Sequence, residues 1–362
     1  MLPVDYCCFK AGKAHIFQLC LLQASSKIKK AVKANVKCLM KYKYLGKTGL
    51  QVSAIALGMM SYGDSNWRDW VKTEAEAKPI VKRAVEAGIN FFDTADMYSL
   101  GQSEEITGRL LKEFTRRDET VIATKVFFKM TDKPNRGGLG RKHIFDSVFD
   151  SLQRLGTDYI DLYQIHRWDY NTPIEETLEA LHDVVKAGWV RYIGASSMAA
   201  YQFTKALYKA DLAKQSRFVS MQNHYNLLYR EEEREMLPLC AEEGIGVIPW
   251  SPLARGHLTR PFAARLTTVR AKSDKKAESI YDFPEAEKII SEVVNISKEK
   301  AVKPAQIALA WLLHKPEVTA PIVGATKLSY LEDALSSLEI SLSENDLDRL
   351  EQYYPARPVL GY

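Results

Sequence analysis

The feature of this sequence that most constrains its fold is the regular alternation of short β-branched or aromatic runs with amphipathic stretches. Eight such runs are predicted to be strands, at residues 54–57, 90–93, 120–124, 160–166, 191–195, 218–222, 246–250 and 320–324. Strands that alternate with helices form parallel sheets. The runs 160–165 and 246–250 are too apolar for a sheet with one face in water, so the sheet should be filled inside and covered outside. The pattern predicts an α/β fold built as a single (β/α)8 TIM barrel.

Helix signals occupy the stretches between these runs. Helices are predicted at 73–87, 103–114, 142–155, 174–187, 199–210, 230–243, 304–314, 329–338 and 343–353. Thr73 is a typical N-cap residue, and Glu76 three positions later completes a capping box. Residues 42–52 are expected to form a hairpin that plugs the lower end of the barrel, and the last helices are expected to be C-terminal additions. The stretch 255–284 contains seven bases and is long for a loop, which is typical of a lid or an insertion.

Charge separates the first 39 residues from the rest. The net charge is +5, but residues 1–39 hold seven lysines and one acid, so residues 40–362 carry slightly more acids than bases. We expect 1–39 to be a disordered or over-extended segment, with a targeting or surface-attachment segment as the alternative, and 40–362 to form the barrel. A body without basic excess argues against nucleic acid as a partner.

No apolar run reaches the ~18 residues of a membrane span. Only Cys240 lies in 40–362, which fits a reducing cytoplasm.

An open doubly wound sheet is the structural alternative, and the sequence argues against it. Such a sheet carries G-x-G-x-x-G after its first strand when it binds a dinucleotide, whereas the turn here is Leu57-Gly-Met-Met-Ser-Tyr-Gly63. The glycines within 137–140 do not fit that pattern, and there is no P-loop. The seven histidines show no H-E-x-x-H or other paired spacing, so no metal site is expected.

Polar residues collect at the predicted carboxyl ends of the strands, where barrel enzymes place their active sites. They are Asp93, Lys125, His166, Ser196, Ser197, Gln222, Trp250 and Ser251. Tyr98 follows Asp93 by five residues and can reach the same space. A phenol has a pKa near ~10, and an ammonium beside it lowers that pKa. With Asp93 holding Lys125 and His166 donating to a carbonyl oxygen, the group could protonate a carbonyl as hydride arrives at its carbon.

Six segments in order resemble the successive signatures of the aldo/keto reductase superfamily. They are Gly88-Ile-Asn-Phe-Phe-Asp-Thr-Ala-Asp-Met-Tyr98, Ala123-Thr-Lys125, Gln164-Ile-His166, Gly194-Ala-Ser-Ser197, Met221-Gln-Asn-His-Tyr-Asn226 and Pro249-Trp-Ser-Pro-Leu253. Residues 165–173 and 229–238 are similar to the bacterial-type branch near the potassium-channel β subunits. The resemblance implies a barrel that binds NADPH without a Rossmann domain and reduces a small-molecule carbonyl compound. It also implies Tyr98 as the acid–base residue, supported by Lys125, Asp93 and His166.

The same resemblance assigns the nicotinamide end of the cofactor. Trp250 falls where the family stacks an aromatic ring on the nicotinamide. Ser196, Ser197 and Gln222 fall where the carboxamide is hydrogen-bonded, although Ser197 replaces the Asn that is common elsewhere. The loop over the pyrophosphate is matched by Ser251, Pro252, Leu253 and Gly256.

At the phosphate and adenine end, the segment Gly324-Ala-Thr-Lys327 matches the opening of the helix near the 2′-phosphate. A helix N-terminus with Thr326 and Lys327 is a reasonable anion site. Arg260 and Arg270 could reach over the phosphates, and Glu332 and Asp333 could lie near the adenine. Thr326, Tyr330 and Asp333 all differ from the residues usual in the family.

The mouth of the predicted barrel is the opening at the carboxyl ends of its strands. Aromatic residues in the loops predicted there suggest a substrate pocket for an apolar or aromatic carbonyl compound. They are Tyr62, Trp67, Trp70, Trp168 and Tyr225.

Two other functions stay open. One is a non-enzymatic NADPH-binding regulatory subunit, although the channel β subunits carry Asn where this chain has His166. The other is 1-deoxyxylulose-5-phosphate formation, which is linked to some bacterial relatives, although no Gly-Asp-Gly motif for thiamine diphosphate is present. A homo-oligomer is compatible with the sequence.

Overall fold

The computed structural model describes residues 40–274 and 279–355. The chain divides into two units, residues 1–38 and 39–362. The segment 1–39, which the sequence sets apart as a tail, lies outside the described residues. The account below therefore concerns the second unit.

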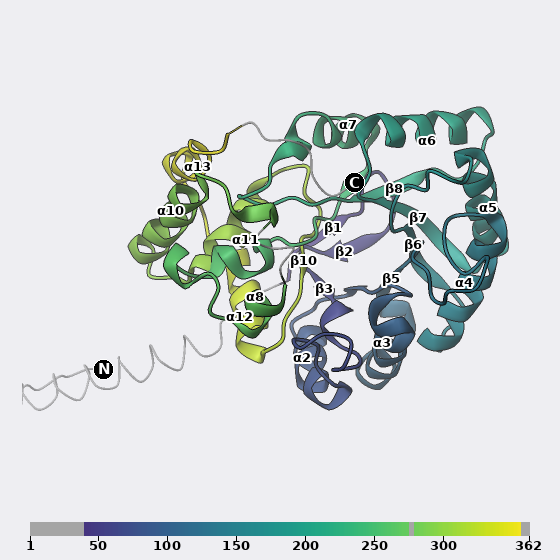
Figure 1. Cartoon of the computed structure of the whole chain (residues 1–362), viewed down its shortest axis with the longest axis horizontal. Coiled ribbons are helices and arrows are strands. Elements are labelled where there is room, and N and C mark those ends of the chain that lie inside the picture. The colour runs from purple at the N-terminus through teal and green to yellow at the C-terminus, as the bar shows by residue number, and fades with distance from the viewer. Residues whose placement is uncertain (1–39, 275–278, 356–362) are drawn as a thin grey trace, which may run out of the picture. The chain divides into compact units, whose positions relative to one another are not determined.

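Eight parallel strands form the centre of this unit (Figure 1). They are β3 (Ala56–Gly58), β4 (Phe91–Asp93), β5 (Val121–Val126), β6 (Ile160–Ile165), β7 (Val190–Ser196), β8 (Phe218–Gln222), β9 (Gly246–Val247) and β10 (Ile322–Val323). Each strand from β3 to β8 pairs with the next one along the chain, and β10 pairs with β3. The amide of Thr319 donates to the carbonyl of Val247 over 2.8 Å, and Ile322 donates to Pro249 over 2.9 Å. These bonds bring the β9 and β10 segments together, which confirms the predicted TIM barrel.

Helices surround the strands, and those near the C-terminus gather on one side in Figure 1. They are α2 (Glu74–Glu86), α3 (Gln102–Phe114), α4 (Arg141–Leu155), α5 (Ile174–Lys186), α6 (Ala200–Leu212), α7 (Met236–Glu243), α8 (Val269–Ser273), α10 (Ala286–Glu299), α11 (Pro304–His314), α12 (Leu328–Ser336) and α13 (Glu344–Glu351). In α5, Leu178, Leu181 and Val184 are buried at helical spacing, so one face packs inward. None of the helices in the described ranges has the length and apolarity needed to cross a bilayer.

Two helix predictions differ from the structure. Residues 230–243 form a 3-10 turn at Glu231–Glu233 followed by α7, rather than one helix. Because Pro238 has no N–H to donate, an α-helix accommodates it in the first turn, and α7 begins two residues before it. The second difference is α10, which the sequence did not predict, although Ile289, Ile290 and Val293 recur at helical spacing and are buried.

The predicted hairpin is present and closes one end of the barrel. Strands β1 (Tyr42–Tyr44) and β2 (Gln51–Ser53) pair antiparallel, with Lys43 opposite Val52. Leu45 is fully buried in the same apolar cluster as Phe91 and Val121, which begin their strands. Since the mouth lies at the other end of the strands, the hairpin is the expected plug.

The long segment after β9 contains short helical turns instead of open loop. These are the 3-10 helices Ala254–Thr259 and Phe262–Ala264, followed by α8. The Arg270 guanidinium carbon lies 4.4 Å from the centre of the Trp70 ring, which belongs to the loop after β3. Arg255 forms an ion pair with Asp274. The segment therefore extends from the end of β9 to the loop that follows β3.

Candidate active site

Lys125 connects the polar groups at the carboxyl ends of β4 and β5. Its Nζ donates to Asp93 Oδ1 over 2.6 Å, to the carbonyl oxygen of Thr94 over 2.7 Å and to Tyr98 Oη over 3.2 Å. The Lys125 and Asp93 side chains are almost fully buried. A buried ammonium needs such partners, because desolvation of an unpaired charge is costly. Burial lowers the pKa of Lys125, but the neighbouring Asp93 carboxylate and Tyr98 raise it more, so the net pKa is raised.

Asp93 is held by two further strands through its second oxygen. Gln164 Nε2 donates to Asp93 Oδ2 over 3.0 Å, and Gln222 Nε2 donates to it over 2.9 Å. Gln222, which the resemblance assigns to the nicotinamide carboxamide, thus uses its amide nitrogen inside the site. The role of Gln164 was not anticipated, although its position one residue before the end of β6 could have indicated it.

The electrostatics of Tyr98 differ from the sequence-based expectation. Burial raises its pKa above the ordinary value of 10.0, and Lys125 lowers it by less than burial raises it. The phenol therefore keeps its proton at neutral pH. The two residues that follow Tyr98, Ser99 and Leu100, both have positive φ, at 48° and 51°. Non-glycine residues seldom adopt this conformation, and such strain is concentrated at functional sites.

His166 lies beside Tyr98. Their rings meet edge to face with centroids 5.7 Å apart, and the Phe128 ring also meets the imidazole edge to face, at 4.8 Å. Burial lowers the pKa of His166 well below 6.5, and Lys125 and Arg167 lower it further. The imidazole is therefore neutral at physiological pH and carries one N–H donor and one acceptor nitrogen.

Trp250 is the outer member of an aromatic stack. His224 lies between Trp250 and Tyr229, with centroid distances of 4.1 and 4.2 Å and nearly parallel planes. The indole N–H of Trp250 donates to Ser197 Oγ over 3.0 Å. Ser196 Oγ donates to the backbone oxygen of Gln222 over 3.0 Å. The sequence did not predict His224 and Tyr229 as part of the site, although His224 lies within one of the segments that resemble the family.

Two cations predicted for the phosphates have no carboxylate partner among the described residues. Lys327 is exposed and is the N-cap residue of α12. Arg260 donates only to Thr259 Oγ1 among the residues described, at 2.9 and 3.0 Å. Gly256 has a φ of +103°, and the space where a Cβ would stand is open. These unpaired charges fit a ligand that brings its own phosphates.

The remaining cofactor candidates vary in their surroundings. Pro252 is buried, Ser251, Leu253 and Thr326 are half-buried, and Gly324 is exposed directly after β10. Glu332 and Asp333 are already paired, with Arg83 at 2.7 Å and with Lys303 at 2.7 Å. Those ion pairs hold α12 against neighbouring helices.

The aromatic candidates for the substrate pocket divide into two groups. Trp67 lies 6.4 Å from Tyr98 between ring centroids, and Trp168 is half-buried two residues after His166. Tyr62 is instead fully buried, with its hydroxyl donating to the backbone oxygen of Ala325 over 2.6 Å. Tyr225 is also fully buried and donates to Glu233. Because both side chains are 0% exposed, neither Tyr62 nor Tyr225 offers ring surface to the mouth in this structure.

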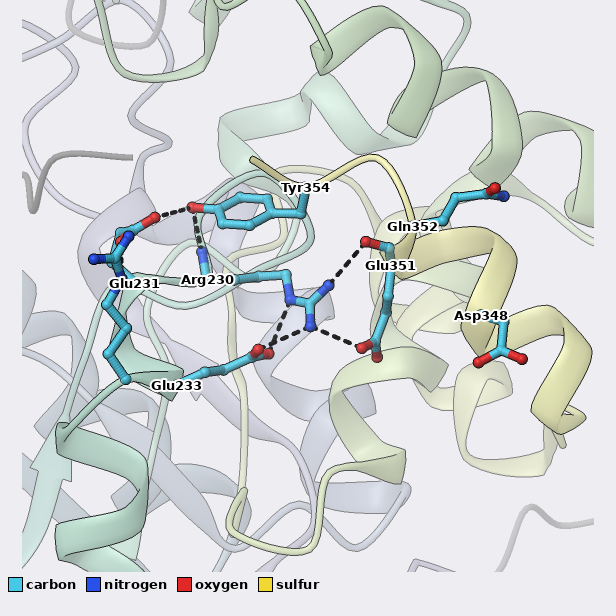
Figure 2. A pocket seen from close by; sticks show the side chains of 8 residues that line it. Arg230, Glu231, Glu233, Asp348, Glu351, Gln352 and Tyr354 are labelled. Carbon is cyan, nitrogen blue, oxygen red and sulfur yellow. Dashed lines mark hydrogen bonds and ion pairs between the residues drawn. The ribbon is translucent and has the colours of Figure 1, made fainter. Parts of the chain in front are cut away.

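A cavity of about 770 Å³ lies elsewhere, between the segment that follows β8 and α13. Figure 2 shows Arg230 at its centre, between Glu233 and Glu351, with Tyr354 donating to Glu231. Arg230 Nη2 lies 2.8 Å from Glu233 Oε2 and 2.7 Å from Glu351 Oε2. Arg230 therefore joins the segment after β8 to α13, which holds the C-terminal helix in place.

Comparison with known proteins identifies the family. The model of the aldo/keto reductase family matches residues 54–355. A Schizosaccharomyces pombe protein named as a candidate aryl-alcohol dehydrogenase is 45% identical over 344 residues, covering 88% of this chain and 97% of that protein. Versiconal hemiacetal acetate reductase of Aspergillus parasiticus is 42% identical over 341 residues, covering 88% and 98%. An aldo-keto reductase of Alternaria alternata is 41% identical over 345 residues, covering 89% and 93%. These relatives are fungal, and they do not place the chain near the channel β subunits. The chain belongs to the aldo/keto reductase family.

Proposed function

We propose that the protein reduces aldehydes and ketones to alcohols with NADPH, and that Tyr98 is the general acid. The observation that carries the proposal is the position of Lys125 Nζ between Asp93 Oδ1 at 2.6 Å and Tyr98 Oη at 3.2 Å. This arrangement places a protonated phenol and a cation at the same point of the mouth. It suits a reaction in which negative charge develops on the phenol oxygen.

Each residue has a distinct part in the reaction. The neutral imidazole of His166 donates a hydrogen bond to the substrate carbonyl oxygen and orients it. Tyr98 then transfers its proton to that oxygen, a general-acid contribution of about 10²–10⁴-fold. The Lys125 ammonium stabilises the phenolate that remains, and Asp93 keeps Lys125 charged and aimed. NADPH, when bound, supplies the hydride.

The cofactor would lie along a line of residues on the mouth. Trp250 would offer the ring face opposite His224 to the nicotinamide, and Ser196, Ser197 and the amide oxygen of Gln222 would hold its carboxamide. The loop 251–256, with Arg260, would cover the pyrophosphate. Thr326 and Lys327 at the start of α12 would hold the 2′-phosphate, which gives the preference for NADPH over NADH. The ion pairs of Glu332 and Asp333 argue for a lesser role at the adenine.

The aromatic side chains near Tyr98 support an aryl carbonyl substrate. Trp67 and Trp168 present flat apolar surfaces, which bury an aromatic ring better than a polar aliphatic chain. A relative named for an aryl-alcohol substrate is consistent with this class. The cytoplasm is proposed as the compartment because the chemistry needs a supply of reduced nicotinamide.

Turnover of 4-nitrobenzaldehyde tests the proposal, followed by the loss of NADPH absorbance. We expect steady oxidation of NADPH that depends on the aldehyde and is slowed by about 10²–10⁴-fold in Tyr98→Phe. Tight NADPH binding without turnover of any aldehyde or ketone would contradict the proposal that the protein is an enzyme. It would favour a non-enzymatic regulatory subunit.

A further inference from the structure

Arg167 lies at the mouth of the barrel, one residue after His166. Its Nη1 donates to the backbone oxygen of His166 over 2.9 Å, and its guanidinium carbon lies 5.9 Å from the centre of the Phe128 ring. Phe128 is also the ring that packs against His166. The side chain is half-buried, and it interacts electrostatically with both Tyr98 and Arg255. Since Tyr98 follows β4 and Arg255 follows β9, the guanidinium lies over the mouth.

Arg167 has no acid to balance it. Lys125 is paired with Asp93, and Arg255 and Arg270 share the single carboxylate of Asp274. No carboxylate in residues 40–274 or 279–355 forms an ion pair with Arg167, and its only hydrogen bond in those ranges goes to His166. Burial lowers the pKa of Arg167, and Arg255 lowers it further. A half-buried guanidinium without a counter-ion is costly unless a ligand supplies the charge.

The proposed cofactor does not account for this cation. Arg255, Arg260 and Arg270 belong to the segment after β9, which would cover the phosphates. Arg167 lies just after β6 and is next to His166, which would orient the substrate carbonyl. We therefore assign the three arginines after β9 to the cofactor and Arg167 to the substrate.

We propose that Arg167 binds a carboxylate on the carbonyl substrate, so that the preferred substrates are aromatic aldehydes that carry an acid group. This inference rests on the proposed function and narrows its substrate class. A guanidinium offers a planar fork of N–H groups that matches the two oxygens of a carboxylate. With Arg167 adjacent to His166, the acid and the carbonyl would lie on one aryl ring that packs against Trp67.

The first test uses the unmodified protein and matched substrates. Initial rates are measured for 2-, 3- and 4-carboxybenzaldehyde and for their methyl esters, which have similar shape and no charge. We expect at least one acid to exceed its ester by about tenfold or more in kcat/KM, the effect of one charge-assisted pair. Turnover of the esters with no acid preferred in any pair would overturn the role of Arg167 and leave the proposed reduction intact. If neither series is reduced, the proposed function itself fails.

The second test assigns the preference to Arg167. In Arg167→Gln the acid-to-ester ratio should fall by about tenfold, mainly through KM for the acid, while kcat for the ester and Kd for NADPH stay near their normal values. Arg167→Lys should recover part of the ratio, because it keeps the charge but loses the fork. Arg191→Gln is the matched control, since that exposed arginine lies at the start of β7, at the other end of the barrel. A ratio unchanged in Arg167→Gln, or an equal loss for acid and ester with weaker NADPH binding, would assign Arg167 to another role.

Discussion

Lys125 Nζ lies 3.2 Å from Tyr98 Oη while it also contacts the carboxylate of Asp93. Burial raises the pKa of Tyr98, and the partners of Lys125 raise its own pKa. Both groups are therefore protonated at neutral pH. The proton is on the phenol before the reaction, and the charge that stabilises its departure is already in place. This arrangement favours Tyr98 as a donor, which is the role needed in the reductive direction.

Replacement of Tyr98 by Phe removes the proton and leaves the ring. We expect Tyr98→Phe to lower kcat for 4-nitrobenzaldehyde by about 10²–10⁴-fold, because general-acid transfer contributes that much. NADPH affinity, measured by quenching of tryptophan fluorescence, should stay near normal. Full activity in this variant would remove Tyr98 from the acid role.

The pH dependence of reduction follows from the two shifted groups. Tyr98 must be protonated, and its pKa lies above 10.0, so activity should persist to alkaline pH and fall only beyond that value. His166 must be neutral to act as described, and its pKa lies well below 6.5, so no loss is expected on acidification to that point. A plot of kcat/KM against pH should be flat between these limits. A decline centred near pH 7 would contradict the assignment.

Removal of the Lys327 side chain tests nucleotide preference. Lys327 is an exposed cation at the start of α12 and has no carboxylate partner among the described residues. We expect Lys327→Ala to raise Kd for NADPH by about tenfold and to leave Kd for NADH almost unchanged. Lys298→Ala, at an exposed position of α10, serves as the control. Equal effects on the two nucleotides would show that Lys327 does not contact the 2′-phosphate.

The C-terminal helix should depend on Glu351. This carboxylate accepts from Trp311 Nε1 at 2.7 Å, Lys315 Nζ at 2.8 Å and Arg230 Nη2 at 2.7 Å. Glu351→Gln should lower the free energy of unfolding by about 1.5–3 kcal/mol in urea titrations at pH 7. Asp348→Asn, in the same helix and exposed, should change it little.

The same contacts make that contribution depend on pH. Burial alone would raise the pKa of Glu351, but Lys315, Trp311 and Arg230 outweigh it and lower the pKa below 4.5. A lowered pKa means that the stabilisation is fully present above pH 4.5 and is lost as pH falls through the folded-state value. The difference between the unmodified protein and Glu351→Gln should therefore shrink in acid. A difference that is constant down to pH 3 would contradict the ion-pair origin.

Much of the framework could be predicted because local patterns determine it. The apolar runs predict the eight strands, although β9 and β10 are only two residues long each. The glycine-containing turn predicts the hairpin. The contacts of Gln222 and the stack of His224 on Trp250 could not be predicted, because they join residues from separate segments of the chain. The sequence predicts that Lys125 lowers the pKa of Tyr98. The pKa is raised instead, because the fold buries the phenol, and the extent of burial cannot be deduced from the neighbouring charges alone.

Asp93 accepts hydrogen bonds from side chains of β5, β6 and β8, so one carboxylate ties four strands together across the barrel. A change at this residue would remove hydrogen bonds to three other strands and, in the proposed reaction, the partner that keeps Lys125 charged. Substitutions at Asp93 and its partners would therefore be poorly tolerated. New substrate specificities would have to arise in the loops that contain Trp67 and Arg167. Relatives that act on different compounds would then share an almost invariant middle and diverge at the rim.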